Sequence, residues 1–135
     1  MFLREFQIRV RYADTDQMGY VYYGNYATFY EIGRVESLRS LGFSYKQLEE
    51  EGVMMPVLES SSKYLGPARY DELLTIKTVI KELPKVKIRF EYEIFNEAGN
   101  LIHTGDTILA FIRKDNHRPC RAPKQILSLL SPYFS

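Results

Sequence analysis

The sequence predicts an α+β domain in which an antiparallel sheet of five strands packs against one long helix. Three observations lead to this prediction. Residues 86–95 alternate apolar with charged side chains, the period of a strand with one buried face. Residues 25–41 place apolar side chains three and four positions apart, as on one face of a helix. Short links such as the Gly-containing loop at 96–100 join neighbouring strands in antiparallel fashion.

The first half of the chain is expected to hold one strand and two helices. Residues 6–10 alternate apolar with polar side chains, and a polar turn ends this strand. Asn25 is suited to cap the long helix and Gly42 to stop it. Ser44 is suited to cap a second, short helix that ends at Gly52. The expected buried face of the long helix consists of Tyr26, Phe29, Tyr30, Gly33, Ser37, Leu38 and Leu41.

The second half is expected to form four strands, at residues 53–64, 72–81, 86–95 and 101–113. In the last of these, both alternating sets are largely apolar, which predicts that both faces of the sheet are covered there. The long helix can cover only one face. The other is expected to meet a second subunit or the segment 123–130, which has the pattern of a short amphipathic helix.

Length and composition narrow the class of protein. The 135 residues correspond to one domain, which we expect to span 1–135. The net charge of +1 excludes the overall basic surplus that binding to nucleic acid or to an acidic membrane needs. The single cysteine, Cys120, excludes an intramolecular disulfide framework. The N-terminus lacks the apolar core of a signal peptide and no stretch is apolar enough to span a membrane, so we expect a cytoplasmic protein.

The segment 12–26 is the densest in chemically useful side chains. It places Asp14 and Asp16 in the turn before the long helix, where an Asp ordinarily makes only backbone hydrogen bonds. A calcium loop starting at Asp14 fails, because its twelfth position is Asn25 where a bidentate Glu is needed. The P-loop, G-x-S-x-G and H-E-x-x-H motifs do not occur. The sequence therefore predicts no metal and no cofactor.

Four motifs follow one another between about residues 5 and 130. They are Arg11-Tyr12-x-Asp14-Thr15-Asp16-x-x-Gly19-x-Val21-Tyr22-Tyr23-x-Asn25-Tyr26, then Phe29-Tyr30-Glu31 with Arg34 and Glu36, then Tyr64-x-x-Pro67-Ala68-Arg69-Tyr70-Asp71-Glu72, and finally Arg121-Ala122-Pro123-Lys124. In this order and spacing, the chain resembles the hotdog-fold acyl-CoA thioesterases of the 4-hydroxybenzoyl-CoA thioesterase type, including the Tol-Pal-associated bacterial branch.

The resemblance implies a hotdog fold, in which the sheet wraps the long helix and two subunits pair their sheets edge to edge. It also implies that Asp16 is the catalytic carboxylate, that Asp14 supports the turn, and that the active site lies between subunits. One carboxylate can act as nucleophile or as base on water, because a thiolate leaves readily once the oxyanion is stabilised.

Stabilisation of the oxyanion is expected from backbone N–H groups at the start of the helix. Tyr23 occupies a family position that carries His in some branches and Tyr in others. We therefore expect its N–H to polarise the thioester carbonyl, with an aromatic wall residue as the ordinary alternative. The expected substrate contacts are Gly19, Val21, Tyr22, Asn25 and Tyr26, of which Tyr22 and Tyr26 equally fit a core or pocket-wall role.

Coenzyme A brings several phosphate charges, so any attraction must come from local cations. Arg118, Arg121 and Lys124 lie within seven residues, and Arg69 follows a proline in a loop. We expect these four residues to bind coenzyme A, with a solvated charged surface as the ordinary alternative. The remaining candidates, His103, His117 and Cys120, fit no ligand or triad spacing, so structural or surface roles are expected.

The predicted function is hydrolysis of an acyl-CoA thioester to free acid and coenzyme A. The expected enzyme is a homodimer or homotetramer that binds no nucleic acid and does not insert into a membrane. Two alternatives stay open: a noncatalytic acyl-binding or partner-docking hotdog module, and a thioesterase acting on acyl carrier protein. The intact Asp16 segment favours the enzyme.

Overall fold

Five antiparallel strands form the main sheet, in the order β1-β4-β5-β6-β3. The computed structural model describes residues 1–134. The strands are β1 (Phe2–Arg9), β3 (Val57–Tyr64), β4 (Leu73–Ile80), β5 (Lys87–Phe95) and β6 (Leu101–Ala110). Every neighbouring pair is antiparallel, which confirms the predicted α+β class.

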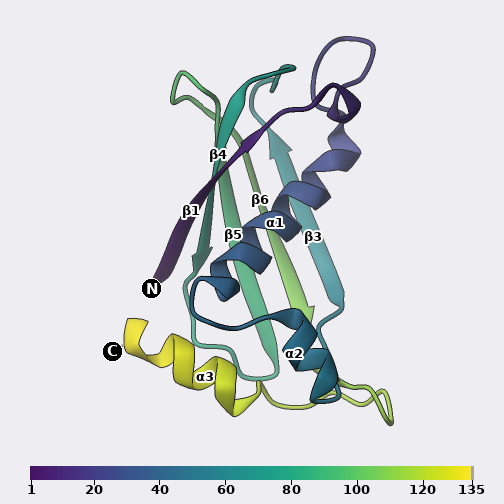
Figure 1. Cartoon of the computed structure of the whole chain (residues 1–135), viewed down its shortest axis with the longest axis vertical. Helices are drawn as coiled ribbons and strands as arrows, with labels where there is room; N and C mark the ends of the chain where they lie inside the picture. The colour runs from purple at the N-terminus through teal and green to yellow at the C-terminus, as the bar shows by residue number, and fades with distance from the viewer. Residues whose placement is uncertain (135) are drawn as a thin grey trace.

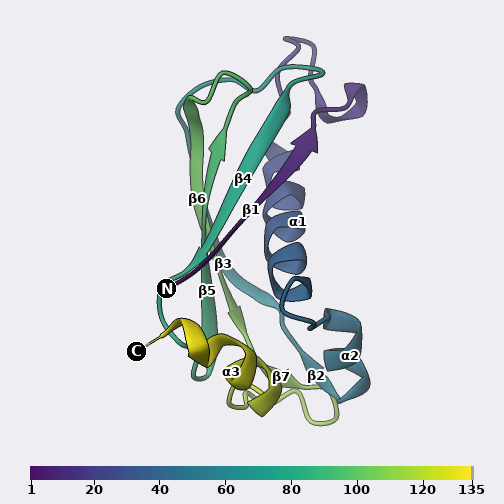
Figure 2. The same ribbon diagram turned by 60° about the vertical axis from the view of Figure 1, so that its left-hand side comes forward.

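The long helix α1 (Tyr26–Arg39) lies diagonally across one face of this sheet (Figures 1 and 2). Six of the seven side chains expected on its buried face are buried, and Leu41 is half-buried just beyond the helix. The helix approaches the sheet closely at Gly33, where a Cβ would lie 2.5 Å from Thr78 Oγ1 on β4. The predicted helix face is therefore the one that packs on the core.

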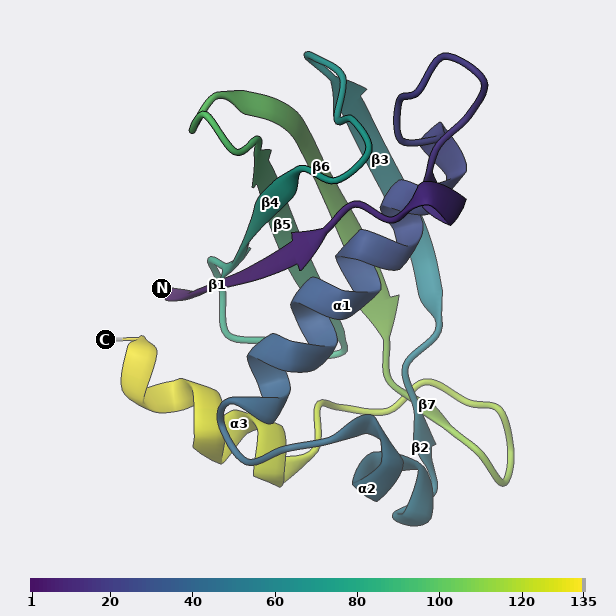
Figure 3. The ribbon, with the colours of Figure 1, turned by 45° about the horizontal axis from the view of Figure 1, so that its top comes forward.

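Short elements close the end of the sheet that is farther from the start of α1 (Figure 3). They are α2 (Tyr45–Glu50), the two-stranded sheet of β2 (Val53–Met54) and β7 (Ile112–Arg113), α3 (Lys124–Leu130) and the 3₁₀ turn η3 (Ser131–Tyr133). The Ser44 side chain accepts a hydrogen bond from Gln47 N at 3.3 Å, so it caps α2 as predicted. In residues 1–134 no helix is both long and apolar enough to cross a membrane.

Two of the predicted strands are broken in the structure. Residues 53–64 divide into β2 and β3 at Pro56, which has no N–H to donate to a ladder. Residues 101–113 divide at Phe111, whose backbone bonds to Val86 and Cys120 instead of continuing the ladder with β3. The side chains on either side of Phe111 therefore do not belong to one alternating series.

The sheet face away from α1 is charged, so the prediction that both faces of residues 101–113 need a cover is wrong. Ion pairs join neighbouring strands on this face: Arg89–Asp106 at 2.6 Å, Lys81–Glu91 at 3.4 Å and Lys77–Glu93 at 3.8 Å. The apolar Ile102 and Ala110 lie at the two ends of β6, where the chain's own segments around Gly66 and Pro56 meet them. Burial on this face therefore gives no argument for a second subunit.

Candidate active site

Asp16 lies in a tight turn between β1 and α1. Its backbone N–H donates to Tyr20 O at 2.8 Å, and its carbonyl accepts the N–H of Gly19, which has a φ of +79° that glycine adopts freely. One carboxylate oxygen, Oδ1, accepts the N–H groups of Met18 at 2.9 Å and Tyr20 at 3.3 Å. The other, Oδ2, has no hydrogen-bond partner among residues 1–134. The turn thus holds the half-buried carboxylate by one oxygen and leaves the other available.

Asp14 is held quite differently, at the end of the 3₁₀ turn η1 (Tyr12–Asp14). Its side chain is buried and accepts the backbone N–H of Arg11 at 2.9 Å, while the Arg11 guanidinium lies 3.3 Å from its other oxygen. Its carbonyl accepts the N–H of Tyr22 at 2.9 Å and the Asn25 amide at 2.8 Å. Both ends of Asp14 are therefore engaged in fixing the loop to the start of the helix.

The segment before α1 forms a second 3₁₀ turn, η2 (Tyr23–Asn25). Asn25 is the N-cap residue of α1, as predicted, but it has helical backbone angles and its side chain makes no capping bond to the helix; its amide donates to the loop instead. The N–H groups of Tyr23 and Gly24 have no backbone acceptor within the described chain. Because the first N–H groups of a helical segment lack internal partners, these two are open to a ligand oxygen.

The mid-chain motif packs against the Asp16 turn. Tyr20 and Arg69 form an isolated antiparallel bridge, and the Arg69 guanidinium lies 5.4 Å from the centre of the Tyr20 ring. The Val21 N–H donates to Ala68 O at 2.8 Å. The structure thus brings together two motifs that are about fifty residues apart in the sequence, and places Arg69 beside the turn that carries Asp16.

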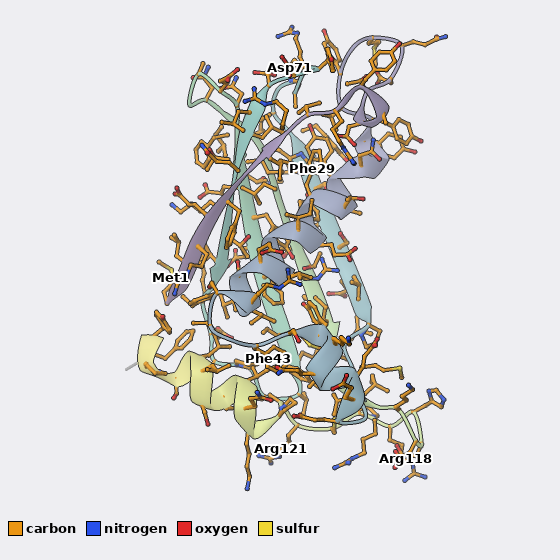
Figure 4. All side chains as sticks on the ribbon, in the orientation of Figure 1. Met1, Phe29, Phe43, Asp71, Arg118 and Arg121 are labelled. Carbon is orange, nitrogen blue, oxygen red and sulfur yellow. The ribbon has the colours of Figure 1, made fainter. Side chains whose placement is uncertain are left out.

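The other three predicted coenzyme A contacts do not lie at the end of the molecule that holds the Asp16 turn. Figure 4 shows Arg118 and Arg121 at the end of the molecule opposite to Asp71, which belongs to the mid-chain motif. Lys124 begins α3 at that same far end. Within one chain, therefore, Arg69 is near the Asp16 turn whereas Arg118, Arg121 and Lys124 are remote from it.

The predicted substrate contacts divide by exposure. Gly19 and Tyr22 are exposed and Asn25 is half-buried. The ring of Tyr22 packs against that of the exposed Tyr23, the predicted carbonyl-polarising residue, with ring centres 4.7 Å apart. Val21 and Tyr26 are buried and belong to the core. The burial of Tyr26 fits the core role that was its alternative, whereas the exposed Tyr22 does not belong to the core.

A buried polar cluster lies beneath the start of α1. His103 stacks on Tyr26, with ring centres 4.0 Å apart, and hydrogen-bonds to the Tyr30 hydroxyl, which lies 2.6 Å from Ser62 Oγ. Burial lowers the pKa of His103 to about 4 and raises that of Tyr30 to about 12, so both are neutral at physiological pH. Sequence reasoning missed this cluster, although His103 falls on the inward alternation of its strand, opposite Tyr64.

Metal ligands do not gather in the part of the chain that the structure describes, where no three His, Cys, Asp or Glu side chains could hold one ion. The carboxylate and the open N–H groups form the chemical centre of this end. Such a pair of groups suits attack on a carbonyl whose oxygen accepts the N–H bonds.

Comparison with known proteins assigns this arrangement to a family. Residues 18–103 match the model of the thioesterase superfamily, which is more than half of the chain. The chain belongs to this superfamily. It is 33% identical to the acyl-CoA thioester hydrolase YbgC of Escherichia coli over 121 residues, 90% of each chain. It is 36% identical to YneP of Bacillus subtilis over 118 residues, 87% of this chain and 86% of that one.

Solved structures agree with the family. A DHNA-CoA thioesterase from Staphylococcus aureus aligns with a TM-score of 0.86 and 37% identity, over 99% of this chain and 85% of that one. The predicted hotdog fold and thioester hydrolase activity are thereby confirmed, and the noncatalytic alternative is not favoured. The enzyme hydrolyses an acyl-CoA thioester to free acid and coenzyme A.

Proposed function

We propose that Asp16 is the catalytic carboxylate of this thioesterase and that the N–H of Tyr23 polarises the substrate carbonyl. The observation that carries the proposal is the Oδ2 atom of Asp16, which accepts no hydrogen bond within residues 1–134. It lies in the turn before η2, where the N–H groups of Tyr23 and Gly24 also lack acceptors. Gly24 supplies the second N–H for the oxyanion. Asp14 acts through the turn, since its carboxylate is already paired with Arg11.

The reaction then needs no metal or cofactor. The carbonyl oxygen accepts the N–H bonds while the Asp16 carboxylate either attacks the carbonyl carbon or removes a proton from an attacking water. The tetrahedral oxyanion is stabilised by the same N–H groups and collapses by breaking the C–S bond. Coenzyme A leaves as a thiolate and takes up a proton. If water attacked, the free acid is released at this step; if Asp16 attacked, the acyl group is left on Asp16 as a mixed anhydride, which a water molecule hydrolyses to the free acid and the regenerated carboxylate.

We further propose that the enzyme is a homodimer, or a tetramer built from it, joined through β3. This strand is an outer strand of the sheet, and all of its side chains except Ser62 are exposed. An unpaired exposed edge is a template for another strand. Leu58, Tyr64 and the following Leu65 add apolar surface along it, each 50–58% exposed.

This pairing supports a shared coenzyme A site. Two copies of β3 that pair antiparallel about a twofold axis place the Tyr64 end of one strand beside the Val57 end of the other. The eight-residue strand is about 27 Å long, so the far end of one protomer comes to the Asp16 end of its partner. We propose that Arg118, Arg121 and Lys124 bind the coenzyme A held at the partner's Asp16, together with Arg69 of the catalytic protomer.

Mixing two inactive variants tests the shared site. Asp16→Asn lacks the carboxylate, and the double variant Arg118→Glu/Arg121→Glu lacks the phosphate contacts. A mixed dimer holds one intact site, because the unchanged Asp16 of one subunit meets the unchanged arginines of the other. After random exchange of equal amounts, about half of the dimers are mixed, so we expect thiol release at about a quarter of the wild-type rate. Light scattering at low micromolar concentration checks the subunit number. A fully active monomer, or mixing without any recovery, would contradict the proposal.

We also propose to which branch of the superfamily the enzyme belongs. The segment from Arg11 to Tyr26 supports the 4-hydroxybenzoyl-CoA thioesterase type, including its Tol-Pal-associated branch. A cytoplasmic location is proposed from the single cysteine, since disulfide-forming compartments favour paired cysteines. Coenzyme A thioesters, rather than acyl carrier protein, are the proposed substrates, and thiol release from both classes distinguishes them.

A further inference from the structure

The outer strand β3 and the residue that follows it have a sequence that is complementary to its own reverse. Residues 57–65 read Val-Leu-Glu-Ser-Ser-Ser-Lys-Tyr-Leu, with Ser61 at the centre. Glu59 and Lys63 carry opposite charges at equal distances from Ser61, and two apolar or aromatic residues lie outside each of them. A twofold axis through Ser61 therefore brings unlike charges of two copies together, and apolar ends together.

The two charged side chains of β3 are available for a partner. Both Glu59 and Lys63 are exposed, and neither forms an ion pair within residues 1–134. On the other outer strand, β1, the side chains of Arg4 and Arg9 donate hydrogen bonds to acceptors of the same chain. Unpaired charges of both signs thus lie on β3.

Glu59 and Lys63 lie on the same face of the sheet, the one away from α1. Ser62 turns to the other face, where its hydroxyl lies 2.6 Å from the hydroxyl of Tyr30 on α1. Because side chains alternate along a strand, its neighbour Lys63 turns away from α1. The register with β6 is regular from Glu59 onward, which gives Glu59 the face of Lys63. Both charges can therefore meet the same face of an antiparallel partner strand.

The backbone of β3 offers hydrogen bonds in the same register. The Leu65 N–H donates to Ile102 O on β6 at 2.9 Å. Because successive residues of a strand turn their N–H and C=O groups to opposite sides, Ser61 also faces β6 with these groups, whereas Ser60 and Ser62 turn theirs outward. In an antiparallel pair centred on Ser61, Ser60 of each copy lies opposite Ser62 of the other and exchanges backbone hydrogen bonds with it.

We propose that a second copy of this chain pairs with β3 about a twofold axis at Ser61, so that Glu59 of each copy forms an ion pair with Lys63 of the other. The inference rests on the proposed homodimer through β3 and fixes its register. An axis at Ser60 or at Ser62 leaves both charges opposite uncharged side chains. Opposite charges that face each other across two strands stabilise the pair, and the register at Ser61 forms two such contacts.

The same register covers the exposed apolar residues at both ends of β3. Val57, Leu58, Tyr64 and Leu65 are each 46–58% exposed, and the first two of one copy lie against the last two of the other. Tyr64 packs on Tyr26, the first residue of α1. Each subunit thereby adds apolar side chains beside the start of its partner's helix, where the thioester carbonyl is proposed to bind.

Exchange between two charge-reversed variants tests this register. A homodimer of Glu59→Lys sets like charges opposite each other twice, and so does a homodimer of Lys63→Glu, whereas a dimer with one subunit of each has both ion pairs. The variants, one of them mass-labelled, are mixed in equal amounts, and native mass spectrometry counts the dimers after subunit exchange. Random exchange makes about half of the dimers mixed. If each reversal changes the equilibrium about threefold, the four altered pairs raise the mixed share to about nine tenths.

The short helix α2 provides the matched control. Lys46 and Glu50 are both exposed on it and have the same spacing along the chain as Glu59 and Lys63. Lys46→Glu and Glu50→Lys change the net charge of the subunits as the test variants do, so attraction between oppositely charged subunits is present in both mixtures. The control variants should mix at random.

A cysteine at the axis gives an independent readout of the register. Residues that lie opposite each other without sharing backbone hydrogen bonds have Cα atoms about 4.5 Å apart, which a disulfide can bridge. Ser61→Cys should therefore cross-link the two subunits on oxidation. The two copies of Ser60 lie diagonally, about 7 Å or more apart, so Ser60→Cys should not cross-link them.

The outcomes separate the register from the homodimer on which it rests. Mixed dimers in excess, with a cross-link in Ser61→Cys, support the register. Random mixing of the test variants in intact dimers overturns it without contradicting the homodimer, as does a cross-link in Ser60→Cys but not in Ser61→Cys. A monomeric wild type in light scattering overturns the homodimer and this inference with it.

Discussion

Acidification should destabilise this enzyme through His103, the buried imidazole beneath the start of α1. Burial lowers its pKa from 6.5 to about 4, whereas in the unfolded chain the imidazole titrates near its ordinary value. Between these values the unfolded state binds a proton that the folded state does not. The stabilisation is therefore complete above pH 6.5 and is lost as the pH falls toward 4. Between pH 7.5 and pH 5, the titration of His103 therefore lowers the free energy of unfolding by about 2 kcal/mol.

Urea unfolding at the two pH values measures this loss. His103→Gln should lose about 2 kcal/mol less than the wild type on acidification, because it removes the titrating group. His117→Asn is the control: it changes an exposed imidazole at a φ of +56°, a conformation that Asn tolerates, and should follow the wild type. NMR titration of the wild-type imidazoles gives the same information without a variant. A His103 pKa close to 6.5 would refute the reasoning.

Three further predictions follow from the loop and the core. Asp14→Asn weakens the pairing with Arg11, so the free energy of unfolding measured by chemical denaturation should fall by about 1–3 kcal/mol while kcat stays near normal. A loss of kcat without a loss of stability would argue against the supporting role of Asp14. Gly105→Ala places a Cβ against the Tyr30 hydroxyl and should lower the free energy of unfolding by about 1–3 kcal/mol. In the control Gly66→Ala the nearest atom lies 3.4 Å from the new Cβ, so the free energy of unfolding should fall by less. An equal fall in the two variants would contradict this reasoning. Thiol release should persist in a chelator, and its loss, with recovery on adding one divalent ion, would reveal a metal site.

Local signals in the sequence predict most of the fold. Apolar side chains three and four residues apart predict the long helix and its buried face, because residues at this spacing lie on the same side of a helix with 3.6 residues per turn. Gly42 and Gly52 end their helices with φ values of +88° and +83°, as their positions suggest. The covering of residues 101–113 could not be predicted in the same way. Phe111 bends the chain out of the ladder, and ion pairs with neighbouring strands replace an apolar cover.

The candidate site is only partly visible in the sequence, because its geometry depends on contacts between distant segments. Asp16 and its turn are predictable from residues that lie next to one another. The bond from Asn25 to the Asp14 carbonyl and the stacking of His103 on Tyr26 are tertiary contacts that no local spacing encodes. The distance of the basic cluster 118–124 from Asp16 likewise follows from the course of the chain, not from its charge.

Turnover of the Asp16→Asn variant is the most direct test of carboxylate catalysis in this enzyme. The Asn side-chain oxygen can still accept the N–H groups of Met18 and Tyr20, so the turn should keep its shape. We expect kcat/KM for acyl-CoA to fall by about 100-fold or more, with stability and subunit number unchanged. Asp115→Asn, in an exposed turn, should keep wild-type turnover. Near-normal turnover in a folded Asp16→Asn enzyme would contradict the assignment of Asp16 as the catalytic carboxylate.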